Sequence, residues 1–288
     1  MADIVTFGDN SVFVSLSTGS GFQNKVRWNT DLCYNDGWRV NKHVRKLSDV
    51  NGDGKADIVS FGNKSTYVSL STGSGFQNKI TWSTDFGYND NWRNWKHVRS
   101  LADVNGDGKS DIVAFGSSSI YVSLSTGSGF QNKVRWNTDL CYNDGWRVNK
   151  HVRKLSDVNG DGKADIVSFG NKSTYVSLST GNGFSRKTTW NTDFGFYDNW
   201  KNDKHVRTLA DVNGDGKNDI VAFGSNNVYV SLSNGIKFQP KLVWVSNNYV
   251  YNQNWIGNPR MSKDVDGNGK SDIVGFGDYG VWVTNSIF

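Results

Sequence analysis

The sequence contains no glutamate, only two cysteines and no long apolar run. Alanine and leucine, which favour helices as glutamate does, are also sparse, whereas Gly, Ser, Thr, Val, Tyr and Trp are frequent. These are residues of strands and turns. The composition therefore predicts an all-β protein.

No apolar stretch approaches the roughly 20 residues that a transmembrane helix needs. The first residues, "MADIVTFGDN", have neither the charged start nor the apolar core of a secretion signal. We therefore expect no membrane insertion, and a location in the cytoplasm or release by a non-classical route.

The two cysteines, Cys33 and Cys141, lie in identical copies of the phrase "NTDLCYNDGWRVNKHVRKLSDVNGDGK". Equivalent positions two repeats apart belong to different units of a repeating fold. A disulfide requires Cα atoms about 6 Å apart, so we expect both cysteines to be free thiols.

The chain repeats itself with a period of 54 residues, shortened to 53 at the last step, when the "DIV" triplets are aligned. Residues 14–73 are identical to residues 122–181. Within one repeat, four short segments rich in β-branched and aromatic residues are separated by Gly, Ser, Asn and Asp, which predicts four strands. The predicted strands lie within residues 97–105, 111–116, 119–127 and 130–138.

Four-stranded units of this length, repeated without helices, are typical of the blades of a β-propeller. We predict one β-propeller domain over residues 1–288, with six blades; five or seven blades are the alternatives. The first blade would have no innermost strand and the last no outermost strand. Self-association through these incomplete terminal blades is therefore a further expectation.

An acidic loop, "DVNGDGKADIVSFG" at residues 49–62, recurs from Asp103, Asp157, Asp211 and Asp264. Oxygen ligands at positions 1, 3, 5 and 9, with the carbonyl of position 7, are the ligands that Ca²⁺ prefers. The loop is not an EF-hand, because Ser60 stands where a bidentate glutamate is needed and strands flank it. The predicted metal ligands are Asp49, Asn51, Asp53, Lys55, Asp57, Asp103, Asn105, Asp107, Lys109, Asp111, Asp157, Asn159, Asp161, Lys163, Asp165, Asp211, Asn213, Asp215, Lys217, Asp219, Asp264, Asp266, Asn268, Lys270 and Asp272.

The alternative for these loops is an Asp/Asn/Gly turn whose side chains cap their own backbone. Three carboxylates within nine residues repel one another unless a cation lies among them, and the arrangement occurs five times. We therefore expect structural calcium rather than magnesium, which tolerates crowded flexible cages poorly.

A second recurring loop joins one repeat to the next, at residues 33–45, 87–99, 141–153, 196–207 and 250–260. It holds all four histidines of the chain and keeps tryptophan, arginine or lysine close to them. An aromatic face beside polar donors suits a sugar. The predicted carbohydrate-binding residues are Tyr34, Trp38, Arg39, His43, Arg45, Tyr88, Trp92, Arg93, His97, Arg99, Tyr142, Trp146, Arg147, His151, Arg153, Tyr197, Trp200, Lys201, His205 and Arg207.

The alternative for this loop is that its tryptophans only pack between neighbouring blades and that its arginines form ion pairs with aspartates. The strand tryptophans, Trp28, Trp82, Trp136, Trp190 and Trp244, are expected to pack in this way. Long loops carry binding residues more often than frameworks do, and this favours a ligand site.

The phrase "DFGYNDNWRNWKHVRSLADVNGDGKSDIVAFG" (85–116) and its copies resemble the Psathyrella velutina lectin family, which is built on FG-GAP-type repeats. The resemblance covers essentially the whole chain. It implies a non-enzymatic, multivalent lectin with pockets between blades, calcium in some acidic loops, and recognition of terminal N-acetylglucosamine and, in some members, sialic acid. The best-known member has seven blades, and the last loop here departs from the pattern at Ile256 and Asn258.

Three other functions are alternatives to a lectin. A hydrolase needs an asymmetric pair of groups with separated pKa values, whereas every candidate here is repeated. A nucleic-acid partner is not expected, because the chain shows no recognised module or clustered basic stripe. An integrin-like, calcium-dependent protein-adhesion module is the remaining alternative to a lectin whose partners are the glycans of glycoproteins or glycolipids.

Overall fold

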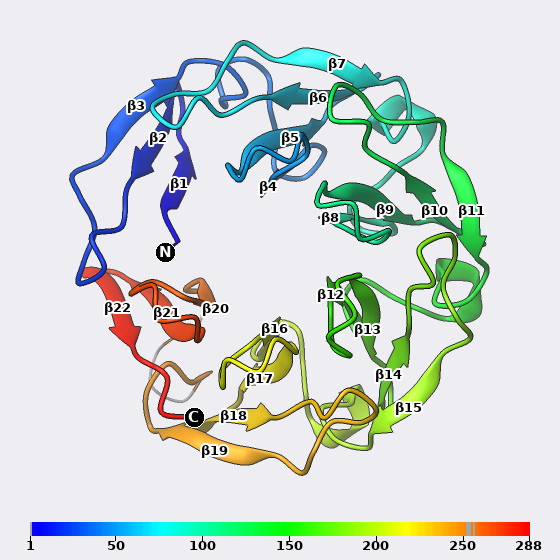
Figure 1. The fold of residues 1–288 in the computed structure, drawn as a ribbon, viewed down its shortest axis with the longest axis vertical. Helices are drawn as coiled ribbons and strands as arrows, with labels where there is room; N and C mark the ends of the chain where they lie inside the picture. The colour runs from blue at the N-terminus through cyan, green and yellow to red at the C-terminus, as the bar shows by residue number, and fades with distance from the viewer. Residues whose placement is uncertain (1, 252–254, 256) are drawn as a thin grey trace. The chain divides into compact units, whose positions relative to one another are not determined.

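The computed structural model describes residues 2–251, 255 and 257–288, which form short strands joined by tight loops (Figure 1). The first three antiparallel sheets contain β1 (Ile4–Phe7), β2 (Val12–Ser15) and β3 (Val26–Asn29); β4 (Val44–Ser48), β5 (Asp57–Phe61), β6 (Thr66–Ser69) and β7 (Ile80–Ser83); and β8 (Val98–Ala102), β9 (Asp111–Phe115), β10 (Ile120–Ser123) and β11 (Val134–Asn137). The next three contain β12 (Val152–Ser156), β13 (Asp165–Phe169), β14 (Thr174–Ser177) and β15 (Thr188–Asn191); β16 (Val206–Ala210), β17 (Asp219–Phe223), β18 (Asn227–Ser231) and β19 (Leu242–Ser246); and β20 (Arg260–Lys263), β21 (Asp272–Gly277) and β22 (Gly280–Thr284).

The fold is a six-bladed β-propeller, as predicted, and each sheet is one blade. Four blades have four strands, and the first and last have three in the described part of the chain. The first blade begins with the strand equivalent to β5, and the last ends with the strand equivalent to β6. The predicted incomplete terminal blades are therefore confirmed. The structure describes three complete 3₁₀ segments, η1 (Tyr88–Asp90), η2 (Tyr142–Asp144) and η3 (Phe196–Asp198), and each is three residues long.

Two compact units divide the chain. One comprises Asp3–Val148 with Ser179–Ser185 and carries the sheets β1–β3, β4–β7 and β8–β11. The other comprises Asn149–Leu178 with Arg186–Phe288 and Ala2, and carries the sheets β12–β15, β16–β19 and β20–β22.

The second strand of each complete blade is buried along its whole length, as in β9. Successive side chains of a strand point to opposite faces of the sheet, so both faces of such a strand meet neighbours. Ile112 and Ala114 of β9 belong to one core cluster with Val59 and Phe61 of β5. Full burial of such a side chain contributes about 1.5–3 kcal/mol, and these clusters are the main source of stability.

The strand tryptophans pack as predicted. Trp82 is buried, and its ring centroid lies 5.4 Å from that of Phe130 in the next blade. Both cysteines are free and buried, which confirms the prediction, and the Cys33 thiol donates to the carbonyl of Asp31 at 3.2 Å.

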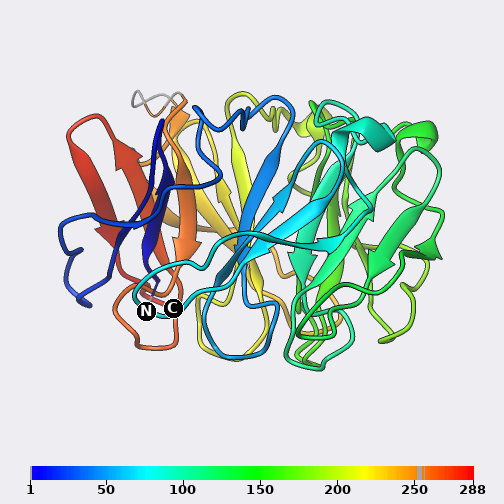
Figure 2. The ribbon, with the colours of Figure 1, turned by 90° about the horizontal axis from the view of Figure 1, so that it is seen from above.

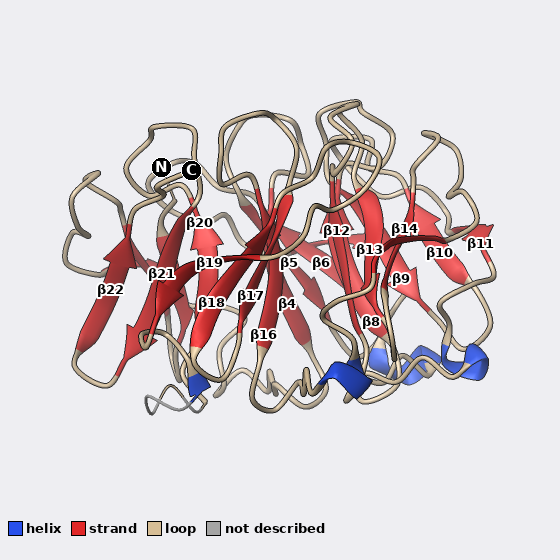
Figure 3. Ribbon diagram, turned by 90° about the horizontal axis from the view of Figure 1, so that it is seen from below, coloured by secondary structure: helices blue, strands red, loops and turns tan. Residues whose placement is uncertain are grey.

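The antiparallel order places two kinds of loop at opposite ends of each sheet (Figures 2 and 3). The loop that joins consecutive blades lies at the start of the first strand, beside the hairpin between the second and third strands. The acidic loop follows the end of the first strand. No helix in the described residues is long and apolar enough to cross a membrane.

Candidate functional site

The loop before β4 is held in shape by its own polar groups. The Asp36 carboxylate accepts a hydrogen bond from the backbone N–H of Cys33 at 3.0 Å. Gly37 follows with a φ of +88°, which a residue with a side chain rarely adopts. The backbone N–H of Asn35 donates to the carbonyl of Asp9 at 2.9 Å, so the loop rests on the hairpin of its own blade.

His43 links this loop to the β5–β6 hairpin. Its Nδ1 accepts a hydrogen bond from the backbone N–H of Arg39 at 3.0 Å, so Nε2 carries the proton and donates to Oδ1 of Asn63, also at 3.0 Å. Burial is the main cause that lowers the pKa of the His43 imidazole. Its ring therefore stays neutral at physiological pH and positions the loop.

The same arrangement recurs in other repeats. His97 accepts from the backbone N–H of Arg93 at 3.2 Å and lies 3.1 Å from the Ser117 hydroxyl. His205 accepts from the backbone N–H of Lys201 at 3.1 Å and lies 2.9 Å from the Ser225 hydroxyl. The Nε2 of His151 lies 3.0 Å from Oδ1 of Asn171.

The loop tryptophans lie mostly inside the protein. Trp38 is 7% exposed, and its ring centroid lies 5.0 Å from that of His43 and 6.2 Å from that of Tyr67. Trp92, Trp146 and Trp200 are buried to the same degree. Packing thus accounts for most of the surface of these rings.

A cavity of about 290 Å³ opens beside Trp38. This is near the lower end of the range for ligand pockets, roughly 300–1,000 Å³. The ammonium of Lys79 is held 2.6 Å from the Asp31 carboxylate, whereas the exposed Lys64 ammonium has no bonded partner in the described part of the chain. The lining residues are Asp36, Gly37, Trp38, His43, Gly62, Asn63, Lys64, Tyr67 and Lys79.

The predicted tyrosine and first basic residue of each loop meet each other instead of lining this cavity. The Arg39 guanidinium lies 3.8 Å from the Tyr34 ring centroid and donates to the Tyr34 carbonyl. Tyr88 with Arg93 and Tyr142 with Arg147 form the same stacked pairs, each at 3.9 Å.

In the fourth loop Phe196, and not the predicted residue Tyr197, occupies the position of Tyr34. Lys201 lies 3.5 Å over the ring of Phe196, which takes the place of Tyr34. Tyr197 is exposed at the position of Asn35. Because Phe196 and Tyr197 are adjacent aromatic residues, the sequence does not show which of them is equivalent to Tyr34.

The second arginine of each loop is part of the framework. Arg99 is buried and donates to the carbonyl of Phe86 at 2.9 Å, and Arg207 donates in the same way to Phe194 at 2.9 Å. Burial lowers the pKa of both to about 10, so they remain charged at neutral pH. Arg45 donates to Leu32 at 2.6 Å from a half-buried position. Arg153 is buried as well. These positions hold the second arginines within the framework of the loop, and their assignment as sugar contacts stays a prediction.

In the last loop the ring centroid of Trp255 lies 5.1 Å from that of Tyr249. Ile256, one of the two departures noted in the sequence, lies outside the described residues, and Asn258 is half-buried.

The sequence predictions missed the hairpin side of the cavity, which contributes Asn63, Lys64 and Tyr67. A signal was present, because in four repeats a tyrosine stands five residues after the "FG" that ends the DIV segment, at Tyr67, Tyr121, Tyr175 and Tyr229. At Gly62 an added Cβ would lie 2.7 Å from Cε2 of Tyr67, so the glycine of "FG" makes room for this ring.

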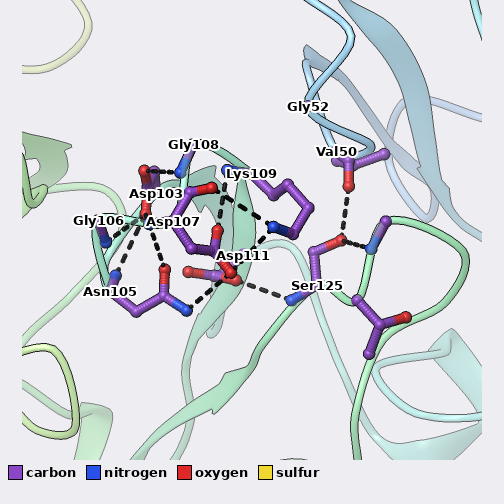
Figure 4. A network of polar contacts seen from close by, with 12 residues as sticks. Val50, Gly52, Asp103, Asn105, Gly106, Asp107, Gly108, Lys109, Asp111 and Ser125 are labelled. Carbon is purple, nitrogen blue, oxygen red and sulfur yellow. Dashed lines mark hydrogen bonds and ion pairs between the residues drawn. The ribbon is translucent and has the colours of Figure 1, made fainter.

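The acidic loops are organised around their first aspartate (Figure 4). Asp103 accepts hydrogen bonds from the backbone N–H groups of Gly106 at 2.7 Å and Gly108 at 2.8 Å. Asp111 is fully buried and accepts from the backbone N–H groups of Val104 and Ser125, at 3.1 and 2.8 Å. The side chains thus cap their own backbone, as in the alternative to a metal site. Oδ1 of Asp103 accepts three backbone N–H groups, whereas Oδ2 of Asp103 and both oxygens of Asp111 accept one each and keep a lone pair for a cation.

Burial raises the pKa of Asp111 and of Asp219 to about 7, and nearby aspartates add to the effect. In four loops the lysine at position 7 pairs with the aspartate at position 5, as Lys109 does with Asp107 at 3.2 Å.

The last loop differs from the other four. Position 5 is Asn268, and Lys270 donates to the carbonyl of Phe288. Asp264, Asp266 and Asp272 each place an oxygen within 4.8 Å of the others, an arrangement found only here among the described residues. This donor set fits a hard cation best.

No family model matches this chain, and no curated protein matches it significantly. Its structure is similar to that of an Agrocybe aegerita lectin that specifically recognises non-reducing terminal N-acetylglucosamine, with a TM-score of 0.83 and 35% identity over 99% of this chain and 73% of that one. It is also similar to part of the Photorhabdus luminescens Tc holotoxin pore, with a TM-score of 0.64 and 17% identity over 98% of this chain and 13% of that one. The second likeness shows the fold alone.

Proposed function

Because this chain belongs to the family of the Agrocybe aegerita lectin, we propose that it is itself a non-enzymatic lectin for glycans that end in N-acetylglucosamine. The observation that carries the proposal is the cavity between the Trp38 loop and the β5–β6 hairpin. The finer assignment to the Psathyrella velutina lectins with FG-GAP-type repeats remains a prediction.

The cavity offers the groups that a neutral acetylated sugar needs. The half-buried ring of Tyr67 and the exposed edge of Trp38 provide an apolar wall for the C–H face of the sugar. The Asn63 side chain gives its Oδ1 to His43, which leaves its amide N–H₂ group to donate to a hydroxyl or to the acetamido carbonyl. Equivalent loops recur, so we expect several weak sites that act together on clustered glycans.

The finer specificity of the sites depends on the hairpin. Lys64 places an ammonium at the first cavity, and the equivalent residue in the next hairpin is Ser118, which accepts a hydrogen bond from Asn143 at 2.7 Å. An ammonium pairs with the carboxylate of sialic acid, whereas a serine hydroxyl does so only weakly. We therefore assign any sialic acid binding to the sites with lysine, Lys64 and Lys172.

Calcium is proposed as a structural ion, first in the loop of Asp264, Asp266 and Asp272. The ion would neutralise carboxylates that otherwise repel one another there. In the other four loops the lysine ammonium already lies beside the aspartate at position 5 and would have to move. The proposal covers all five loops, and the last is expected to bind most tightly.

A glycan array tests the lectin proposal. Signal on structures that end in N-acetylglucosamine, competed by the free sugar and not by galactose, is the expected result. An array without signal on any such structure would sink the proposal and favour the calcium-dependent adhesion module.

A further inference from the structure

In the last blade the third strand, β22, forms the outer edge of the sheet, whereas in the complete blades a fourth strand covers the third. In those blades the third strand pairs with the second strand on one side and with a fourth strand on the other, as β18 does with β17 and β19. Within the described residues, β22 pairs with β21 only. Its outer edge therefore presents backbone N–H and C=O groups to any strand that can reach them.

The side chains of β22 are exposed where their equivalents are covered. Val281 and Val283 face Phe276 and Val274 of β21, as Val228 and Val230 face the equivalent residues of β17. Val281 and Val283 are each 38% exposed, whereas Val228 and Val230 are 0% exposed. Trp282 between them is 55% exposed.

β22 is the third strand of its blade, but its sequence resembles that of the fourth strand of the neighbouring blade. It reads "GVWVT", and β19, which covers β18, reads "LVWVS". The tryptophan of β19, Trp244, is only 6% exposed where β19 covers β18. A copy of β22 thus carries the residues that fill this position in the neighbouring blade.

We propose that β22 pairs antiparallel with β22 of a second copy of this chain, which makes a two-fold dimer. In β18 and β19, Asn227 faces Ser246 and Val228 faces Val245, and the register then shifts at a bulge so that Tyr229 faces Val243. The proposed pair keeps the first two pairings and continues them without the bulge, so that Gly280 faces the second copy's Thr284 and Val281 faces the second copy's Val283. This regular register is symmetric about Trp282, so both copies make identical contacts, as a two-fold interface requires.

The charge pattern of β22 permits this pairing. Gly280–Thr284 contains no charged residue, so two copies meet without repulsion. Of the outer strands, β3 and β11 each carry an arginine, which discourages pairing between edges, whereas β7, β15 and β19 carry no charge. What distinguishes β22 from these outer strands is therefore the exposure of valines whose equivalents in the complete blades are covered. The pair is five residues long, so the dimer is expected to be reversible and to depend on concentration. The inference does not rest on the proposed sugar specificity.

Sedimentation velocity over a range of protein concentrations tests the proposal. The mass should rise toward twice that of the chain, and Val283→Lys should abolish this rise because it places a charge at the centre of an apolar pair. Val243→Lys is the matched control, since Val243 is an exposed valine of the outer strand β19. The control variant should dimerise like the parent chain.

A charge-swap variant tests the register. Val281→Asp combined with Val283→Lys sets opposite charges across the pair and should restore the dimer that Val283→Lys alone has lost. Circular dichroism of each variant establishes that it is folded. A chain that stays monomeric throughout, a dimer lost with Val243→Lys instead, or a failed charge-swap rescue would each overturn the proposal.

Discussion

The Nε2 atom of His43 lies 3.0 Å from Oδ1 of Asn63. This one bond joins the loop between two blades to the hairpin of the following blade, and the proposed sugar cavity lies between the two. His43 therefore acts as a positioning residue, because both of its ring nitrogens are already engaged within the protein.

The first prediction concerns pH. Burial lowers the pKa of His43, His151 and His205, so the unfolded chain binds protons more readily than the folded one. The stability that these residues contribute is present above the ordinary pKa of about 6.5 and is lost as pH falls through the lowered value. Sugar affinity should fall with it, because a proton on Nδ1 breaks the bond from the Arg39 backbone.

NMR titration of the imidazole signals and calorimetric titration of N-acetylglucosamine at pH 5 and 7.5 measure this effect. Melting temperature alone does not isolate it, because the raised pKa of Asp111 changes stability with pH in the opposite direction. Histidine midpoints above 6.5 would contradict the prediction.

The second prediction concerns Tyr67. Tyr67→Ala should remove one sugar site, since it deletes the apolar wall of one cavity and leaves the other repeats intact. Calorimetry should show a lower stoichiometry with unchanged affinity at the remaining sites. Tyr279→Ala is the control, because Tyr279 is 98% exposed and lies outside the cavity lining. An unchanged stoichiometry for Tyr67→Ala would remove the cavity from the proposed function.

The third prediction concerns Lys64 and Ser118. Lys64→Ser should weaken binding to sialylated glycans about tenfold, which corresponds to the loss of one charge-assisted hydrogen bond of roughly 1.5 kcal/mol, and should spare N-acetylglucosamine. Ser118→Lys should have the reverse effect on sialylated glycans. If the two substitutions change sialoside binding equally or not at all, lysine does not determine the specificity of these sites.

The fourth prediction concerns calcium. EDTA should lower the melting temperature and added Ca²⁺ should restore it, with about 2.7 kcal/mol gained at a hundredfold excess over the dissociation constant of one site. Asp266→Asn should remove the tightest site, whereas Asp278→Asn, an exposed residue outside the acidic loops, should not. An identical melt with and without EDTA, together with no bound metal by elemental analysis, would refute the structural role.

The fifth prediction concerns the glycine of "FG". Gly62→Ala should cost about 1–3 kcal/mol, because the added methyl group would lie 2.7 Å from the Tyr67 ring in a packed region. Gly129→Ala should cost far less, since the nearest atom to its Cβ lies 3.8 Å away. Urea unfolding of the two variants provides the comparison, and equal costs would show that Tyr67 moves aside freely.

The sequence by itself determined the all-β class, the repeat, the four strands of a blade and the incomplete terminal blades. These features are local: alternating β-branched residues form strands, and Asn, Asp and Gly form the turns between them. Because this local pattern recurs along the chain, it also predicts a fold built of similar four-stranded blades. For the same reason the packing role of Trp82 and the free state of Cys33 were predicted correctly.

The tertiary structure decided which side chains of the recurring loop face a cavity. Arg99 and Trp92 belong to one motif with Arg93, yet Arg99 is directed inward to a backbone carbonyl and Arg93 is stacked on Tyr88. Asn63 and Tyr67 reach the site from a hairpin more than twenty residues away from Trp38. These outcomes depend on how neighbouring sheets pack, and a pattern of residues along one chain segment does not contain that information.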